Sequence, residues 1–178
     1  MPRTNSADYR SPAAAPCTGN SEGDADPALV GEEMKSKLIN DGAEKTFALI
    51  FDKGDEVTAT LLDFAKENKL SASHFTAIGA FSDCTLGFFE RDRKDYKRIS
   101  IKEQVEVVSL TGNIVVTENG EHKLHAHVVV GKDDGTAHAG HLLEGHVWPT
   151  LEVVLIESPE NLRRKLDQET GLPLISID

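Results

Sequence analysis

Cysteine is nearly absent from this chain, whose 178 residues contain only Cys17 and Cys84. The two have none of the paired spacings of a disulfide framework or a cysteine metal site, so we predict no disulfide and a reducing compartment. Long apolar runs are absent too. The first thirty residues hold no stretch long enough for a signal peptide, and no segment is long and apolar enough to span a membrane. These absences favour a cytoplasmic protein.

Basic charge is also scarce. The chain has 19 Lys and Arg against 30 Asp and Glu, which gives a formal net charge of −11. Because affinity for nucleic acid comes largely from basic side chains that neutralise phosphates, this chain would need a local basic patch to bind DNA by itself. The best candidate is the segment RDRKDYKR at 91–98, which carries five basic and two acidic residues. A solvated loop is the simpler interpretation, so direct DNA binding is disfavoured.

The N-terminal part of the chain has little that could be buried. Residues 1–33 are rich in Pro, Ala, Ser, Gly and Asp, and they include four of the seven prolines. A segment that buries little apolar surface cannot offset the entropy lost on folding. We therefore predict a disordered extension over 1–33 and a single domain over 34–178.

Hydrophobic periodicity predicts one main helix followed by many strands. Asp55 and Glu56 suit a helix N-terminus, and apolar residues recur at helical spacing after them, so we predict an amphipathic helix over 55–68. A short helical turn is predicted over 161–169. The predicted strands are 46–51, 74–81, 84–89, 96–101, 104–110, 113–117, 123–131, 136–143 and 151–156. One helix among consecutive strands indicates an α+β fold with a mostly antiparallel sheet.

Three histidines are the most informative feature of the chain. His125 and His127 lie one residue apart in the apolar run LHAHVVV, and His141 follows a short turn. Residues i and i+2 of a strand face the same way, so the first two imidazoles would project from one face of the sheet.

The turn between these histidines predicts their register. The loop Asp133–Gly135 has Gly at its last position, as three-residue hairpin loops commonly do, and it would pair Lys132 with Thr136. Counting outward pairs His127 with His141, and directly opposite residues share a face. Three imidazoles would then converge, and neutral imidazole suits zinc as well as copper, iron and nickel. We predict a site for a divalent metal ion, with zinc as the preferred metal and His125, His127 and His141 as its ligands.

Other residues near this set are weaker candidates. His138 falls on the opposite face in the predicted register, and His146 remains a candidate fourth ligand. Glu106, Glu144 and Glu152 are candidate acceptors for a histidine ring N–H, although outward-facing strand residues would look the same. Histidines that are structural, with no metal, stay open as the alternative for the whole set.

Three segments share their order and spacing with one known family. They are LHAHV at 124–128 with AGHL at 139–142, TLEVVL at 150–155, and EQVEVVSLTG at 103–112. They resemble the plant-and-prokaryote conserved (PPC) domain, and the resemblance covers about residues 43–158. It implies an α+β fold that assembles as a homotrimer, a metal site at the histidines, and a DNA-binding description taken from plant relatives with AT-hooks. The AT-hook core Arg-Gly-Arg-Pro does not occur here, and the Gly-Arg-Phe of plant members is replaced by Glu103-Gln104-Val105.

Three functions follow as hypotheses. The first is a trimeric metal-binding protein of this type that acts through protein contacts, with any regulatory link to DNA being indirect. The second is a small metalloenzyme with an open three-histidine zinc site, although the sequence shows no substrate motif, no Ser/His/Asp arrangement and no phosphate loop. The third is direct DNA binding, which the acidic charge opposes.

Overall fold

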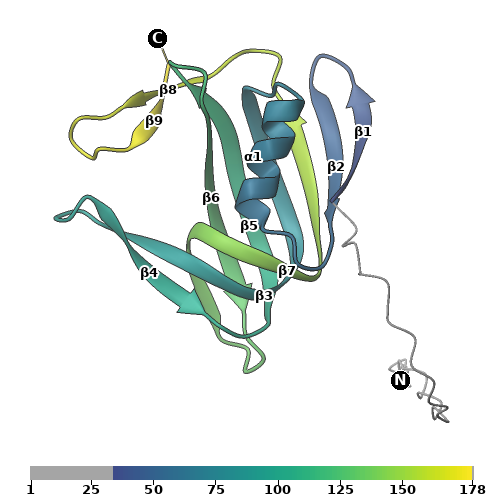
Figure 1. The fold of residues 1–178 in the computed structure, drawn as a ribbon, viewed down its shortest axis with the longest axis vertical. Coiled ribbons are helices and arrows are strands. Elements are labelled where there is room, and N and C mark those ends of the chain that lie inside the picture. Colours follow the sequence, from purple (N-terminus) through teal and green to yellow (C-terminus); the bar gives the residue numbers. More distant parts are fainter. Residues whose placement is uncertain (1–33, 178) are drawn as a thin grey trace, which may run out of the picture. The chain divides into compact units, whose positions relative to one another are not determined.

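The computed structural model describes residues 34–177, which form nine strands and one helix (Figure 1). The extension predicted over 1–33 lies outside the described residues. Within 34–177, no helix has both the length and the apolar character that crossing a membrane requires. The elements in chain order are β1 (Lys35–Asp41), β2 (Lys45–Phe51), α1 (Val57–Glu67), β3 (Ala72–Glu90), β4 (Asp95–Ile101), β5 (Val105–Thr117), β6 (His122–Gly131), β7 (Ala137–Glu157), β8 (Arg163–Leu166) and β9 (Pro173–Ser176).

Helix α1 begins and ends within two residues of the predicted positions. The Glu56 carboxylate caps its N-terminus by accepting hydrogen bonds from the backbone N–H groups of Thr58 and Ala59. Asn68 is the C-cap, and Lys69 follows with a positive φ of 55°. The apolar face of the helix is buried through Val57, Leu61, Phe64 and Ala65.

Strands β3 and β7 are each longer than the sequence predicts. The segments predicted as separate strands over 74–81 and 84–89 form one 19-residue strand, and those over 136–143 and 151–156 belong to one 21-residue strand. The two pair antiparallel along most of their length, with register shifts at three places. Such bulges bend and twist a strand without ending it, which the alternation pattern does not reveal. At one of these shifts Gly79 has a φ of 153°, and a Cβ there would lie 2.3 Å from the Thr150 carbonyl oxygen.

The long strands close a circuit of hydrogen-bonded neighbours. β3 pairs with β5, β5 with β6, β6 with β7, and β7 with β3, all antiparallel. β2 and β1 extend the sheet beyond β7, and β4 pairs with the second half of β3. The largest fully buried side chains belong to one hydrophobic cluster and include Phe51, Phe75, Phe81, Leu49, Leu61, Leu86, Leu110, Ile114, Leu151 and Leu155. Helix α1 contributes to the same cluster through its apolar face, which gives the predicted α+β architecture.

The helical turn predicted over 161–169 is wrong, and α1 is the only helix among the described residues. Residues Arg163–Leu166 instead form β8, which pairs parallel with β5 and antiparallel with β9. A helix of so few residues is marginal by itself, whereas Val116 and Thr117 at the end of β5 supply hydrogen-bond partners from a distant part of the chain. The β8–β9 hairpin extends beside β6 in Figure 1 and forms one wall of the site described next.

Cys84 is buried in the core, and it is the one cysteine among the described residues. Burial, with a smaller contribution from the charge of Asp83, raises the pKa of its thiol to about 11. A thiol with this pKa stays protonated near neutral pH and is a poor nucleophile or metal ligand.

Candidate metal centre

Strand β6 presents His125 and His127 on the face opposite its core contacts. The intervening Ala126 and the following Val128 are buried in the hydrophobic cluster, so strand alternation turns both histidines away from it. The apolar residues that hold β6 in the sheet therefore also fix the direction of the two imidazoles.

The turn into β7 brings His141 to the same place. The backbone N–H of Lys132 donates to the carbonyl of Thr136, and Gly135 has a φ of 79°, as predicted for the three-residue loop. In the resulting register His127 lies directly opposite His141, also as predicted. His138 lies opposite Val130 and is not part of the group.

The three imidazoles form a compact cluster. One nitrogen from each ring lies within 4.8 Å of the other two, and the Nε2 atoms of His125 and His127 are 3.2 Å apart. The 3.2 Å between His125 and His127 suits two nitrogens that each lie about 2.0–2.1 Å from a shared ion. The Nδ1 atom of His141 is buried and has no hydrogen-bond partner among the described residues, which is costly unless a further group satisfies it. The residues present thus fit a metal ion held by three histidine ligands.

The surroundings favour the neutral form of two of the three imidazoles. Partial burial and the neighbouring His125 and His127 lower the pKa of His141 to about 4. Partial burial, His127 and Arg164 also lower the pKa of His125. Metal ions bind neutral imidazole, so these two ligands need not lose a proton near neutral pH before an ion binds.

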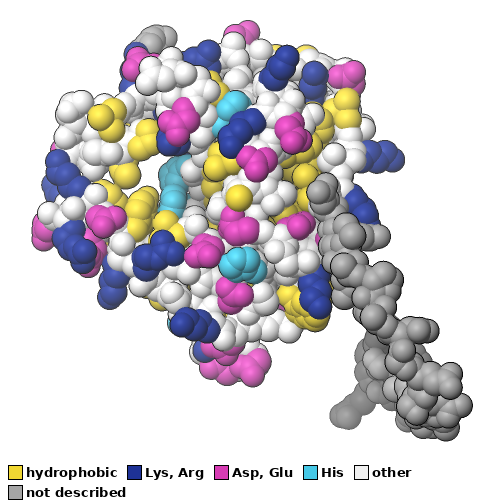
Figure 2. All heavy atoms as spheres, viewed as in Figure 1, with side chains coloured by type: hydrophobic (Ala, Val, Ile, Leu, Met, Phe, Trp, Pro, Cys, Tyr) yellow, Lys and Arg dark blue, Asp and Glu magenta, His cyan; other side chains and the backbone are white. Residues whose placement is uncertain are grey.

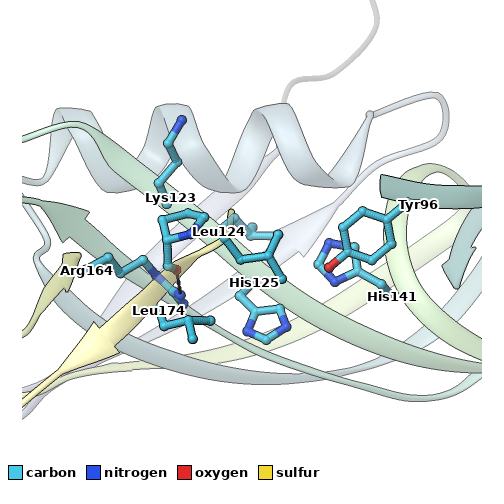
Figure 3. Close-up of a pocket in the computed structure, with 9 residues that line it drawn as sticks. Tyr96, Lys123, Leu124, His125, His141, Arg164 and Leu174 are labelled. Atoms are coloured by element: carbon cyan, nitrogen blue, oxygen red, sulfur yellow. Dashed lines mark hydrogen bonds between the residues drawn. The ribbon is translucent and has the colours of Figure 1, made fainter. Parts of the chain in front are cut away.

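Tyr96 of β4 covers one side of the cluster. Its ring stacks on His141 with centroids 4.6 Å apart, and burial raises the pKa of its hydroxyl. Figure 3 shows Tyr96 and His141 side by side at one end of a pocket, with His125 next to them and Arg164 at the other end. The pocket has a volume of about 200 Å³ and is also lined by Leu124 and Leu174.

His146, the candidate fourth ligand, lies outside the histidine cluster. The Nδ1 atom of His146 is 2.9 Å from the Asp83 carboxylate, and His146 does not belong to the cluster. This carboxylate raises the pKa of His146, and the same contact lowers the pKa of Asp83.

The three candidate glutamate acceptors are not hydrogen-bonded to the histidine cluster. Glu144 pairs with Arg98 at 3.2 Å. Glu106 and Glu152 line two other surface hollows, away from the cluster.

Sequence reasoning missed two residues of the site, Tyr96 and Arg164. Both come from segments far from the histidines in the chain. Tyr96 lies where the segment interpreted as a solvated loop, 91–98, overlaps the predicted strand 96–101, and Arg164 lies in the predicted helical turn over 161–169. Arg164 follows Arg163 and precedes Lys165, a run that looks like an exposed basic turn. Nothing in this run reveals that Arg164 alone is buried.

Comparisons with known proteins agree with this fold. The family model of the Plants and Prokaryotes Conserved (PCC) domain, the domain abbreviated PPC above, matches residues 39–159. A search of curated proteins finds no match. Among solved structures, a candidate DNA-binding protein from Bacteroides thetaiotaomicron is 30% identical with a TM-score of 0.75, over 82% of this chain and 98% of that one.

Two archaeal structures are similar as well. A plant- and prokaryote-conserved protein from Pyrococcus horikoshii is 29% identical with a TM-score of 0.70, over 83% of this chain and 97% of that one. A metal-containing protein from Archaeoglobus fulgidus is 29% identical with a TM-score of 0.67, over 81% of this chain and 98% of that one. The family match covers more than half of the chain, and the chain belongs to the Plants and Prokaryotes Conserved (PCC) domain family.

Proposed function

We propose that this protein is a cytoplasmic, homotrimeric PCC-domain protein that binds one divalent ion, zinc, through His125, His127 and His141 and acts through protein contacts. The observation that carries the metal site is the approach of three imidazole nitrogens to within 4.8 Å of one another from two paired strands. Three imidazoles are a donor set that suits zinc. The metal-containing relative from Archaeoglobus fulgidus supports the same assignment.

Metal analysis of protein purified without a histidine tag tests the site. We expect about one zinc per chain in the wild type and almost none in His125→Ala. The matched control is His138→Ala, which removes an exposed histidine from β7 and should keep the full metal content. Full metal content in His125→Ala would remove the site assignment.

A small metalloenzyme is the second candidate function, and the pocket beside the cluster favours it. His125 and His141 both line this pocket, so a substrate there would lie next to a bound ion. Zinc with three protein ligands keeps a position for water and lowers the pKa of that water to about 7. Hydrolase and lyase panels with and without a chelator test this function, and no chelator-sensitive turnover would count against it.

An apolar patch on the sheet supports self-association. Ile78, Val108 and Val154, from β3, β5 and β7, are 61%, 59% and 45% exposed and line one shallow hollow. Adjoining exposed apolar side chains mark interaction surfaces more often than scattered ones do. Light scattering after size exclusion should give a trimer for the wild type and smaller species for Ile78→Glu. The matched control Leu166→Glu changes an equally exposed residue of β8, at 62%, and should stay trimeric.

Direct DNA binding remains disfavoured. Arg93 and Arg98, in the basic segment 91–98, pair with Glu90 and Glu144. Figure 2 shows basic and acidic side chains interspersed over the face of the molecule that it displays. Any link to DNA would then pass through a protein partner. A mobility-shift titration at low salt should show no complex, and binding that weakens steeply with added salt would refute this view.

A further inference from the structure

Arg164 carries a charge in a place where a charge is costly. The residue is 5% exposed, in the middle of β8. Burial lowers the pKa of its guanidinium, which means that its surroundings disfavour the charged form. Buried charges in proteins are normally paired with an opposite charge.

Within residues 34–177, no carboxylate forms an ion pair with Arg164. Its Nη1 atom donates to the Pro173 carbonyl at 2.7 Å, and its Nη2 atom donates to the side-chain oxygen of Asn113. Both acceptors are neutral, and the buried Nε atom has no hydrogen-bond partner in the described part of the chain. Because a guanidinium has five N–H donors, most of them have no acceptor among residues 34–177.

The hydrogen bond to Asn113 places this charge beside the histidines. Asn113 lies directly opposite His125 in the β5–β6 ladder, so the two side chains share one face. The charge of Arg164 contributes to the lowered pKa of His125, which agrees with their closeness. Arg164 and His125 both line the pocket of about 200 Å³ shown in Figure 3.

We propose that this pocket binds a small organic monocarboxylate, with the carboxylate paired to Arg164 and the rest of the molecule lying against His125 and His141. An anion there supplies the missing counter-charge, and guanidinium N–H groups match carboxylate oxygens in geometry. The apolar side chains of Leu124 and Leu174 suit a short carbon body. The placement of that body next to a metal ion rests on the proposed function, whereas the anion subsite rests on Arg164 alone.

The pocket's size and composition narrow the ligand class. A volume of about 200 Å³ has room for an acid of a few carbons. The other basic residue of the pocket, Lys123, already pairs with Glu121 at 2.6 Å. One unpaired cation matches one carboxylate better than it matches a phosphate dianion.

Calorimetric titration of the zinc-loaded protein with acetate, lactate and pyruvate tests the subsite. Lactamide, a neutral analogue of lactate, is the control ligand, and inorganic phosphate tests the competing anion. We expect at least one of the acids to bind, and lactate to bind more tightly than lactamide. Arg164→Gln should weaken acid binding roughly 30-fold, since it removes a charge-assisted hydrogen bond. The matched control Arg163→Gln changes the exposed neighbour, whose guanidinium donates to the Leu162 carbonyl, and should bind like the wild type.

Arg164→Gln could also disturb the fold, because Arg164 helps to hold β8 and β9 in place. A second variant therefore blocks the pocket without changing Arg164. Leu174→Trp fills the pocket from a 43% exposed position and leaves the guanidinium intact. It should abolish acid binding while the thermal unfolding midpoint stays near that of the wild type.

The results separate this inference from the proposed metal site. Full zinc content with no acid bound, equal binding of lactate and lactamide, or tighter binding of phosphate would overturn the anion subsite alone. Absence of zinc, together with acid binding that depends on Arg164, would overturn the metal site and leave the subsite standing.

Discussion

Gly112 links the packing of the sheet to the geometry of the histidine cluster. It lies on β5 opposite Ala126, the residue between His125 and His127. A Cβ added at Gly112 would lie 2.6 Å from the His125 carbonyl oxygen, 2.6 Å from Cζ of Phe75 and 2.9 Å from Cβ of Ala126. Ordinary contacts begin near 3.4 Å, so strand β6 and the Phe75 ring must both move away from the new Cβ by about 0.8 Å.

We therefore expect Gly112→Ala to destabilise the protein and to weaken metal binding. Overpacking a close-packed site costs about 1–3 kcal/mol, and the lower chain entropy of alanine in the unfolded state returns about 0.4–1 kcal/mol. The net loss is roughly 1–2 kcal/mol of unfolding free energy, or a fall in Tm of about 2–8 °C for a chain of this size. Zinc affinity should fall as well, because the strained backbone carries His125.

Gly131→Ala is the matched control, since it changes a glycine at the end of β6, away from the histidines. Its Cβ would meet only Cγ2 of Val108, at 3.4 Å, which is an ordinary contact. Thermal unfolding followed by circular dichroism, at one protein concentration and without metal, measures stability, and calorimetry measures zinc affinity. A Gly112→Ala protein as stable as the wild type, or a Gly131→Ala protein equally destabilised, would refute the packing argument.

Further predictions concern two polar contacts. The raised pKa of His146 gives stability that is present below its unfolded pKa, about 6.5, and is lost as pH rises through the folded value. The lowered pKa of Asp83 gives stability that is present above its unfolded pKa of 3.8 and is lost as pH falls through the folded value. Asp83→Asn should therefore lower the free energy of unfolding most between about pH 4 and 6.5. The loss should be only about 0.5 kcal/mol, because both side chains are over a third exposed. An equal loss at pH 9 would contradict this prediction. Glu157 accepts hydrogen bonds from the Ala72 N–H and from the hydroxyl of Ser73, a residue that is 2% exposed. Glu157→Ala leaves these buried donors without an acceptor, so the free energy of unfolding measured in urea should fall by about 1–3 kcal/mol. Ser73→Ala measures the share of that one hydroxyl, and a Glu157→Ala protein with unchanged stability would show that water replaces the carboxylate.

Local patterns predicted much of the fold. The helix follows from the spacing of Val57, Leu61 and Phe64 and from the acidic N-cap at Glu56. The register of the β6–β7 hairpin follows from the glycine at the end of the Asp133–Gly135 loop. These predictions hold because each depends on interactions within a few residues along the chain.

The predictions that are wrong concern segments whose structure depends on distant parts of the chain. The helical turn predicted over 161–169 is wrong because β8 takes its hydrogen bonds from β5, about 47 residues earlier in the chain. The division of β3 into two strands is wrong because bulges opposite β7 carry the strand through a bend. In both cases the deciding partner is a distant strand that no local pattern contains.

The sequence by itself determined the three-histidine cluster, because strand alternation and one turn suffice to bring His125, His127 and His141 onto one face. Only the tertiary structure decided what lies around the cluster. Tyr96 and Arg164 reach it from β4 and β8, whose positions depend on pairing with β3 and β5. Burial then distinguishes Arg164 from its exposed neighbour Arg163, since the cost of an uncompensated charge depends on its surroundings and not on its residue type.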